Sequence, residues 1–331
     1  MKTNEKDFFA KYGFFVLLGI TAIMAVTVPR MASPYQLNVM NMTLIYAIGC
    51  LGISIMMGMG GYMMLMSIAF AGIGGFMSAN LSMKFGFPVW LSIIAGSLSM
   101  GVFCYLLGQA LLNLSGSFFA FSGMGIVQIS FTFMQNFKPF TGGPDGMTFI
   151  PQLRLFGIQF DNYRKWFYML LVLMILAGLC VERVRNSSFG RALQSIRDDR
   201  LAAQTLGIPI KSTSNYAFTI AGLVAGLAGG LIVHHNGSAS ATLFTQATSN
   251  RWFLMSMIGG VNSTVGTIFG VILMNFLPET MRVAGQYMRI LDGALIIILM
   301  TFMPMGLAGL AKTLYNRVRK GGKKKTEAVV N

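Results

Sequence analysis

Charged residues are scarce in this chain. Of its 331 residues only 11% are charged, and just 10 are acidic, whereas a soluble domain carries about 25% charged residues. Hydrophobic residues make up 54% of the chain, and its 39 glycines would allow close contact between helices in lipid. The deficit of charge excludes a soluble globular fold and predicts an all-α polytopic bundle of transmembrane helices.

Cysteine is also rare. Cys50, Cys104 and Cys180 each lie inside an apolar run, with neither C-x-x-C spacing nor a disulfide framework. We expect them to be small buried side chains. The adjacent pair His234 and His235 would point about 100° apart on a helix, so we expect no metal site.

The chain lacks the G-x-x-x-x-G-K-[ST] motif that cradles nucleotide phosphates. It also lacks a constellation of nucleophile, histidine and carboxylate that would suggest hydrolytic chemistry. We therefore expect neither an enzyme nor a bound cofactor. A net charge of +15 could indicate nucleic acid, but the distribution of the basic residues favours membrane orientation, so we expect no nucleic acid partner.

Apolar runs predict about eight to ten spans within a single transmembrane domain, residues 1–331. We interpret the first run as an uncleaved helix, because no A-x-A-like cleavage site follows it. The predicted helices cover 13–28, 37–57, 62–81, 87–112, 117–137, 165–182, 214–235, 264–281 and 290–310.

Residues 250–261 form a shorter apolar piece that ends at Gly259 and Gly260. A helix of this length covers about 18 Å of a hydrocarbon core about 30 Å thick. The piece therefore predicts a half-span or one arm of a re-entrant hairpin, which is tolerated only where protein or a watery cavity surrounds it.

Basic residues gather in three places: the N-terminal tail from Lys2 to Lys11, an insert at 183–211, and a tail at 312–331. Basic loops of membrane proteins face the cytoplasm. Six predicted passes separate the N-terminus from the insert, so all three clusters can lie on one side. We expect cytoplasmic N- and C-termini in the inner membrane of a bacterium.

The insert separates two strongly apolar stretches and needs an explanation. Ser187 and Ser188 offer a helix N-cap, and Gly207 offers a C′ position with Pro209 beyond it. These signals predict one capped helix of about 18 residues on the cytoplasmic surface.

On that helix, Leu193, Ile196, Ala203 and Leu206 would share one apolar face. The face suits a groove on a partner protein. An amphipathic helix on lipid headgroups or a solvated loop are the alternatives, although headgroup-binding faces are usually purely basic. The charges around this face have both signs: Arg197, Asp198, Asp199 and Arg200.

Five ordered motifs spanning about 58–310 resemble the branched-chain amino-acid ABC permease family. GRALQSIRDDRLAAQTLGI (190–208), followed by AFTIAGLVAGLAGGL (217–231), looks like that family's ATPase-coupling loop and next helix. The remaining motifs match in order: GIGGF (72–76), TGGPDGMTFIPQLRLFG (141–157), GGVNSTVGTIFG (259–270) and DGALIIILMTFMPMGLAGL (292–310).

The resemblance implies a permease of the vitamin-B12/ribose structural type. Its partners would be a second permease subunit in a heterodimer, two ABC ATPase subunits that carry ATP and Mg²⁺, an extracytoplasmic substrate-binding protein and membrane lipid. The implied coupling residues are Gly190, Arg191, Leu193, Ile196, Arg197, Asp198, Asp199, Ala203, Leu206 and Gly207.

The chain differs from the family pattern at four positions. His or Gln is expected at Ser67, Glu at Gln128, Gly at Asn262 and Pro at Thr267. These differences bear on the substrate rather than on the architecture.

Small and polar residues indicate a translocation pathway. Polar groups inside a membrane tend to face the bundle interior or a watery route. Hydrogen bonds between helices, or plain packing of small residues, would explain the same patterns. The candidates are Gly125, Gln128, Thr132 and Gln135 of the helix at 117–137, with Ser67, Ala71, Gly74 and Ser78 opposite them on the helix at 62–81.

The sequence therefore predicts the permease subunit of an ATP-driven importer for branched-chain or other hydrophobic amino acids. Urea, short amides or aromatic acids are alternative substrates. An ion-coupled secondary transporter is the alternative mechanism, but such proteins commonly place ionisable residues near the midplane. Here every Asp and Glu lies at the end of a predicted helix or in a loop.

Overall fold

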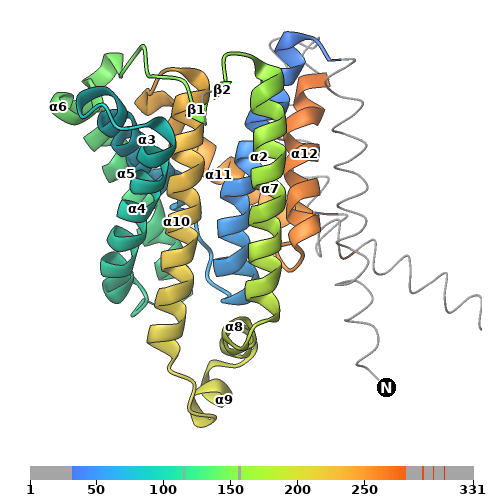
Figure 1. The fold of residues 1–331 in the computed structure, drawn as a ribbon. Coiled ribbons are helices and arrows are strands. Elements are labelled where there is room, and N and C mark those ends of the chain that lie inside the picture. The colour runs from blue at the N-terminus through green and yellow to red at the C-terminus, as the bar shows by residue number, and fades with distance from the viewer. Residues whose placement is uncertain are drawn as a thin grey trace, which may run out of the picture.

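The computed structural model is built almost entirely from helices that stand side by side (Figure 1). The predicted helix over 13–28 and the basic tail 312–331 lie outside the described residues, and so does nearly all of the predicted helix over 290–310. The described residues are 32–114, 116–155 and 158–280, with positions 293, 301 and 309.

The helix α2 (Pro34–Ile53) lies inside the bundle and continues as the π-helix η1 (Ser54–Met59). A capping box fixes its start: the Gln36 N–H donates to Ser33 Oγ, and the Ser33 N–H donates to Gln36 Oε1. The second half of α2 is buried except for the half-buried Tyr46. Together α2 and η1 confirm the predicted span at 37–57.

Five spans within the described residues are long and apolar enough to cross a membrane, and the first is α2 with η1. The other four begin and end within four residues of their predictions, because apolar composition and turn signals coincide at their ends. They are α4 (Val89–Leu111), α5 (Ser117–Asn136), α7 (Tyr163–Asn186) and α10 (Ile210–Asn236).

The predicted helix at 62–81 starts too early. The structure instead has a non-helical segment over 60–66, and α3 (Ser67–Lys84) begins only after it. Gly60 and Gly61 explain the difference, since Gly61 adopts a left-handed φ of 76° that ends helical geometry. Hydropathy alone could not show this break, because the segment is as apolar as a helix.

Glycines bring α3 and α10 into close contact. A Cβ added to Gly74 would lie 2.8 Å from the Gly226 Cα, and one added to Gly75 would lie 2.8 Å from the Gly229 carbonyl oxygen. Small residues at such interfaces let helix backbones approach in lipid. These contacts make α10 a central helix of the bundle.

The apolar piece predicted over 250–261 forms a short helix, α11 (Gln246–Gly259), which begins four residues earlier than predicted. Its 14 residues extend about 21 Å. A turn at Gly260 then leads into α12 (Thr264–Thr280), which packs beside α11. The short 3-10 helix η3 (Ala241–Phe244) precedes α11.

The bundle has two different ends (Figure 1). The polar insert forms α8 (Ser188–Asp198) and α9 (Arg200–Thr205) at one end. The loop between α5 and α7 lies at the other end, where the Met147 N–H donates to the Ala239 carbonyl at 2.8 Å. This loop contains α6 (Lys138–Thr141), η2 (Gly143–Asp145) and the antiparallel pair β1 (Arg154–Leu155) and β2 (Ile158–Gln159).

The prediction that all three cysteines are buried is wrong for Cys180. Cys50 and Cys104 are buried, but Cys180 is exposed on the outer face of α7. An apolar run predicts a span but not which side of it faces the bundle. The two histidines are buried: His234 bonds to Ser78 Oγ and the Pro151 carbonyl, and His235 packs against Trp166.

Candidate functional site

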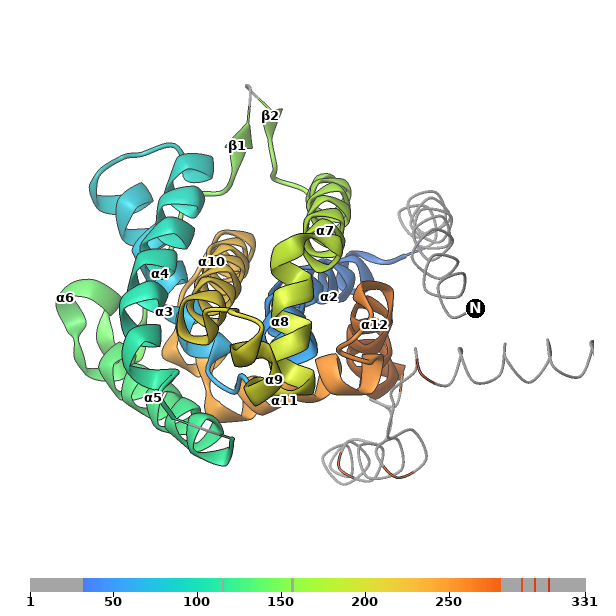
Figure 2. The ribbon, with the colours of Figure 1, turned by 90° about the horizontal axis from the view of Figure 1, so that it is seen from below.

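The polar insert begins where the sequence predicts. Ser187 leaves helical geometry after α7, and its Oγ accepts a hydrogen bond from the Gly190 N–H at 3.2 Å. This bond satisfies one of the free N–H groups in the first turn of α8. Gly190 has no room for a side chain, because an added Cβ would collide with the backbone at Val184 and Arg185. Seen from below, α8 crosses underneath the bundle (Figure 2).

The predicted single helix is wrong, because the insert forms two helices that meet at Asp199. This residue is extended, with φ −154° and ψ 110°. Its carboxylate accepts from the Leu201 and Ala202 N–H groups at 2.9 and 3.0 Å, so it caps α9. The end at Gly207 is confirmed by its left-handed φ of 77°.

The break changes which residues face outward. Leu193, Ile196 and Ala203 are buried against the chain itself, with exposed fractions of 0, 4 and 1%. The prediction that these three share a partner-facing side with Leu206 is therefore wrong. Leu206 is 77% exposed, and Leu201, which the sequence interpretation missed, is 76% exposed. Leu201 lies in the first turn of α9, and Leu206 is the residue at its C-terminal cap.

Arg197 connects α8 to two other segments. Its Nη1 donates to the Gly58 carbonyl at 2.5 Å and to Asn262 Oδ1 at 2.6 Å. Asp198 braces the guanidinium by accepting from its Nε and Nη2 at 2.9 and 2.8 Å. The charges predicted to face a partner are thus used inside the chain, and Arg191 likewise donates to the Asn186 carbonyl and Ser188 Oγ.

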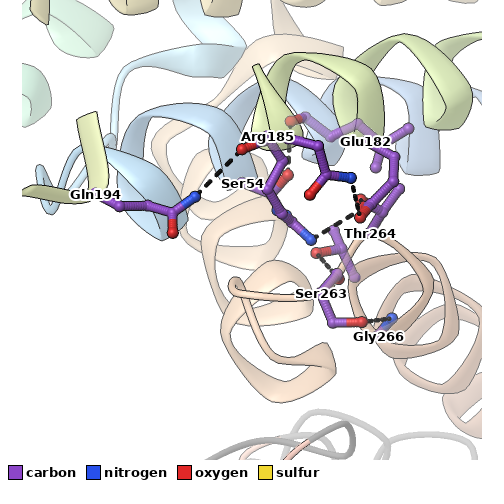
Figure 3. Close-up of polar contacts among 10 residues, drawn as sticks. Ser54, Glu182, Arg185, Gln194, Ser263, Thr264 and Gly266 are labelled. Atoms are coloured by element: carbon purple, nitrogen blue, oxygen red, sulfur yellow. Dashed lines mark hydrogen bonds and ion pairs between the residues drawn. The ribbon is translucent and has the colours of Figure 1, made fainter. Parts of the chain in front are cut away.

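A polar cluster joins the end of α7 to the start of α12 (Figure 3). The Glu182 carboxylate accepts from Thr264 Oγ1 at 2.7 Å and pairs with Arg185 at 3.3 Å. Gln194 of α8 donates to the Arg185 carbonyl at 3.4 Å. The insert is therefore attached to α7, to η1 and to the α11–α12 hairpin at once.

The structure does not bring the two predicted pathway sets together. Ser67, Ala71, Gly74 and Ser78 of α3 are all buried. A Cβ added to Gly229 of α10 would collide with the Ala71 backbone. Ala71, Gly74 and Ser78 therefore pack against α10 and α4 instead of facing the polar residues of α5.

The polar stripe on α5 lies on the opposite side of its helix from the bundle. Gly125, Gln128 and Thr132 are exposed, Gln135 is half-buried, and a Cβ added to Gly125 would meet nothing within 4 Å. The face of α5 that packs inward carries Phe119, Ala120, Gly123, Val127, Ser130 and Met134.

Within the described residues, no group of three or more His, Cys, Asp or Glu side chains could hold a metal ion. One end of the bundle presents a braced pair of short helices, and one side presents a polar stripe.

The chain matches a known protein family. Residues 35–304 match the family described as the permease component of branched-chain amino acid transport systems. No solved structure matches the chain.

Three relatives illustrate the range of similarity. The chain is 29% identical to the high-affinity branched-chain amino acid transport system permease protein LivM of Escherichia coli, over 90% of this chain and 76% of that protein. It is 29% identical to LivM of Salmonella typhimurium over 86% and 72%. It is 26% identical to the fructose import permease protein FrcC of Rhizobium meliloti over 66% and 64%. With its helical bundle, its capped insert and a family match over most of its length, the chain belongs to the family of branched-chain amino acid transport permeases.

Proposed function

We propose that this chain is the membrane-spanning permease subunit of an ATP-driven importer for branched-chain or other hydrophobic amino acids. Family membership over residues 35–304 carries the proposal. Two relatives that cover most of the chain are named for branched-chain amino acid transport. This subunit would not itself catalyse a reaction, since separate ATPase subunits would hydrolyse ATP.

The ATPase would dock on α9 and the first turn beyond it. A docking surface needs exposed apolar anchors on a rigid support. Leu201 and Leu206 are exposed by 76 and 77% in a region that would face the cytoplasm. Asp199 caps the helix that carries Leu201, and the buried Ala203 holds that helix against the bundle.

The second permease subunit would face the polar stripe of α5. Gln128 and Thr132 are exposed in the middle of a helix long enough to cross the membrane. Lipid offers no partner for such groups, so they are better placed against another subunit or a watery route. The translocation pathway would then lie between the two permeases, with one wall made by α5.

The remaining partners follow from the same proposal. The end that carries α8 and α9 would face the cytoplasm together with both chain termini. The end that carries β1 and β2 would receive an extracytoplasmic substrate-binding protein. The complex would contain two permeases, as a heterodimer, and two ATPases that bind ATP and Mg²⁺ in the bacterial inner membrane.

The substrate is the part of the proposal with a competing candidate. A relative over two thirds of the chain is named as a fructose import permease, so similar scaffolds serve unlike substrates. Urea, short amides or aromatic acids are therefore alternatives for this chain. A ligand screen on the cognate binding protein separates them, because that protein sets the affinity.

Co-purification tests the docking surface. The permease complex would be captured in detergent with its cognate ATPase subunits, using the wild type and a Leu201→Glu, Leu206→Glu double variant. We expect the wild type to retain the ATPases and the double variant to lose them while it unfolds at the same temperature. Failure of the wild type to bind the ATPases, with the insert intact, would contradict the proposal.

A further inference from the structure

The segment 60–66 has an unusual position for non-helical backbone. Tyr62, Leu65 and Met66 are buried, with exposed fractions of 8, 8 and 0%. Backbone of this kind inside a membrane protein needs hydrogen-bond partners from the surrounding protein. The Tyr62 N–H donates to the Met56 carbonyl, and Ser249 Oγ of α11 donates to the Leu65 carbonyl.

The start of the segment contacts α8 of the polar insert. Arg197 donates to the Gly58 carbonyl in η1, just before the segment begins. Gly61 then passes so close to α8 that an added Cβ would lie 2.8 Å from Arg197 Cγ. Because π-helical turns such as η1 often mark functional sites, this contact joins α8 to a backbone geometry that is already unusual.

Buried side chains of the segment also contact α5. The Tyr62 and Phe119 rings are 5.2 Å apart and meet edge to face. A Cβ added to Gly123 would lie 3.0 Å from Met66 Cε. Gly123 is two residues before Gly125, where the exposed stripe begins, so the segment touches the inner side of the helix that carries the stripe.

One group in the segment has an unmet bond. The Tyr62 hydroxyl is buried and, within the described residues, has no hydrogen-bond partner. Burial of an unpaired hydroxyl costs about 1–3 kcal/mol.

We propose that the segment 60–66 is the link that carries movement of α8 to α5, and that Arg197 is the positioning residue that holds α8 to this link. The proposal rests on the proposed function, because it is ATPase closure that would move α8. When α8 shifts, Arg197 pulls on Gly58 and presses on Gly61, and Tyr62 and Met66 displace α5 with its stripe.

The contact between Arg197 and Asn262 gives this link a second anchor. Asn262 lies in the turn between α11 and α12, and α11 holds the segment through Ser249. Arg197 therefore fixes the segment from both sides, directly at Gly58 and Gly61 and indirectly through α11.

The test compares Arg197→Met with Arg183→Met in the full complex in proteoliposomes. Arg183 is an exposed arginine in the last turn of α7, so it matches the charge that is lost. Uptake and ATP hydrolysis are measured together. We expect R197M to keep its ATPases and hydrolyse ATP while uptake per ATP falls about tenfold. R183M should match the wild type, and Arg197→Lys should recover part of the loss.

Hydrogen exchange reports on the link itself. ATP-dependent closure should change exchange at residues 60–66 in the wild type and in R183M, but not in R197M. If R197M does not assemble, Asn262→Gly and Tyr62→Leu decide the question, since each should lower uptake per ATP without loss of the ATPases. Wild-type uptake per ATP in the Arg197 variant, or in both of these, would overturn the link. A wild-type complex that imports nothing would instead contradict the proposed function.

Discussion

Single residues set how closely the helices approach. Gly229 of α10 lies so near the Ala71 carbonyl of α3 that no side chain fits between them. A Cβ added to Gly125 of α5, by contrast, would meet nothing within 4 Å. These two glycines look alike in the sequence, yet the structure gives only Gly229 a packing role.

Gly229→Ala should therefore destabilise the bundle, while Gly125→Ala should not. The added methyl group would force α3 and α10 apart, and overpacking of this kind costs about 1–3 kcal/mol. Thermal unfolding in detergent measures the effect as a lower midpoint for G229A. Equal midpoints for the two variants would show that α3 and α10 are not in close contact.

Ala203→Asp is a second test at this scale. Ala203 is 1% exposed against the chain itself, so the substitution buries an unpaired charge within the insert rather than on a docking face. We expect lower yield and a lower unfolding midpoint. Ala202→Asp, one position away and exposed, should behave as the wild type. The reverse order would show that the inward face is wrongly assigned.

At the scale of elements, the insert works as two helices instead of one. The Asp199 carboxylate holds the first turn of α9 through two N–H groups. Capping bonds of this kind contribute about 1 kcal/mol. The first turn of α9, which carries Leu201, therefore depends on this side chain for part of its stability.

Asp199→Ala should fray α9. Without the cap, the Leu201 and Ala202 amides lose their acceptor, so their hydrogen exchange should accelerate by about fivefold. Asp198→Ala removes a neighbouring carboxylate that braces Arg197 and should leave these amides unchanged. Equal acceleration in both variants would contradict the assignment of the cap.

The elements also show what a sequence can predict. Apolar length located α2, α4, α5, α7 and α10, because lipid demands a long apolar helix whatever the helix contacts. It could not locate the non-helical segment 60–66, the break at Asp199 or the inward turn of Leu193. Apolar length does not record the left-handed Gly61 or the Asp199 cap, nor tertiary contacts such as the one between Arg197 and Gly58.

At the scale of the whole molecule, the polar stripe of α5 defines a side of the bundle. Gln128 and Thr132 are exposed although they belong to a membrane-spanning helix. The pathway set on α3 was predicted to face them, but its small side chains pack inward instead. In the proposed importer, α5 would form one wall of the route, and the second subunit would supply the other.

Accessibility to a water-soluble thiol reagent tests this side. In the assembled importer, and in a Cys180→Ser background, Gln128→Cys should react faster than Ile129→Cys by about tenfold. Ile129 is 71% exposed but points about 100° away from Gln128, toward lipid. Equal protection of both cysteines would remove the watery route from this face.

ATP-driven uptake is the most direct test of the central claim. The permease pair, the ATPases and the binding protein would be reconstituted in proteoliposomes with labelled leucine. We predict uptake that requires hydrolysable ATP and persists when an ionophore collapses the ion gradients. Uptake that survives without ATP and stops with the ionophore would contradict the account.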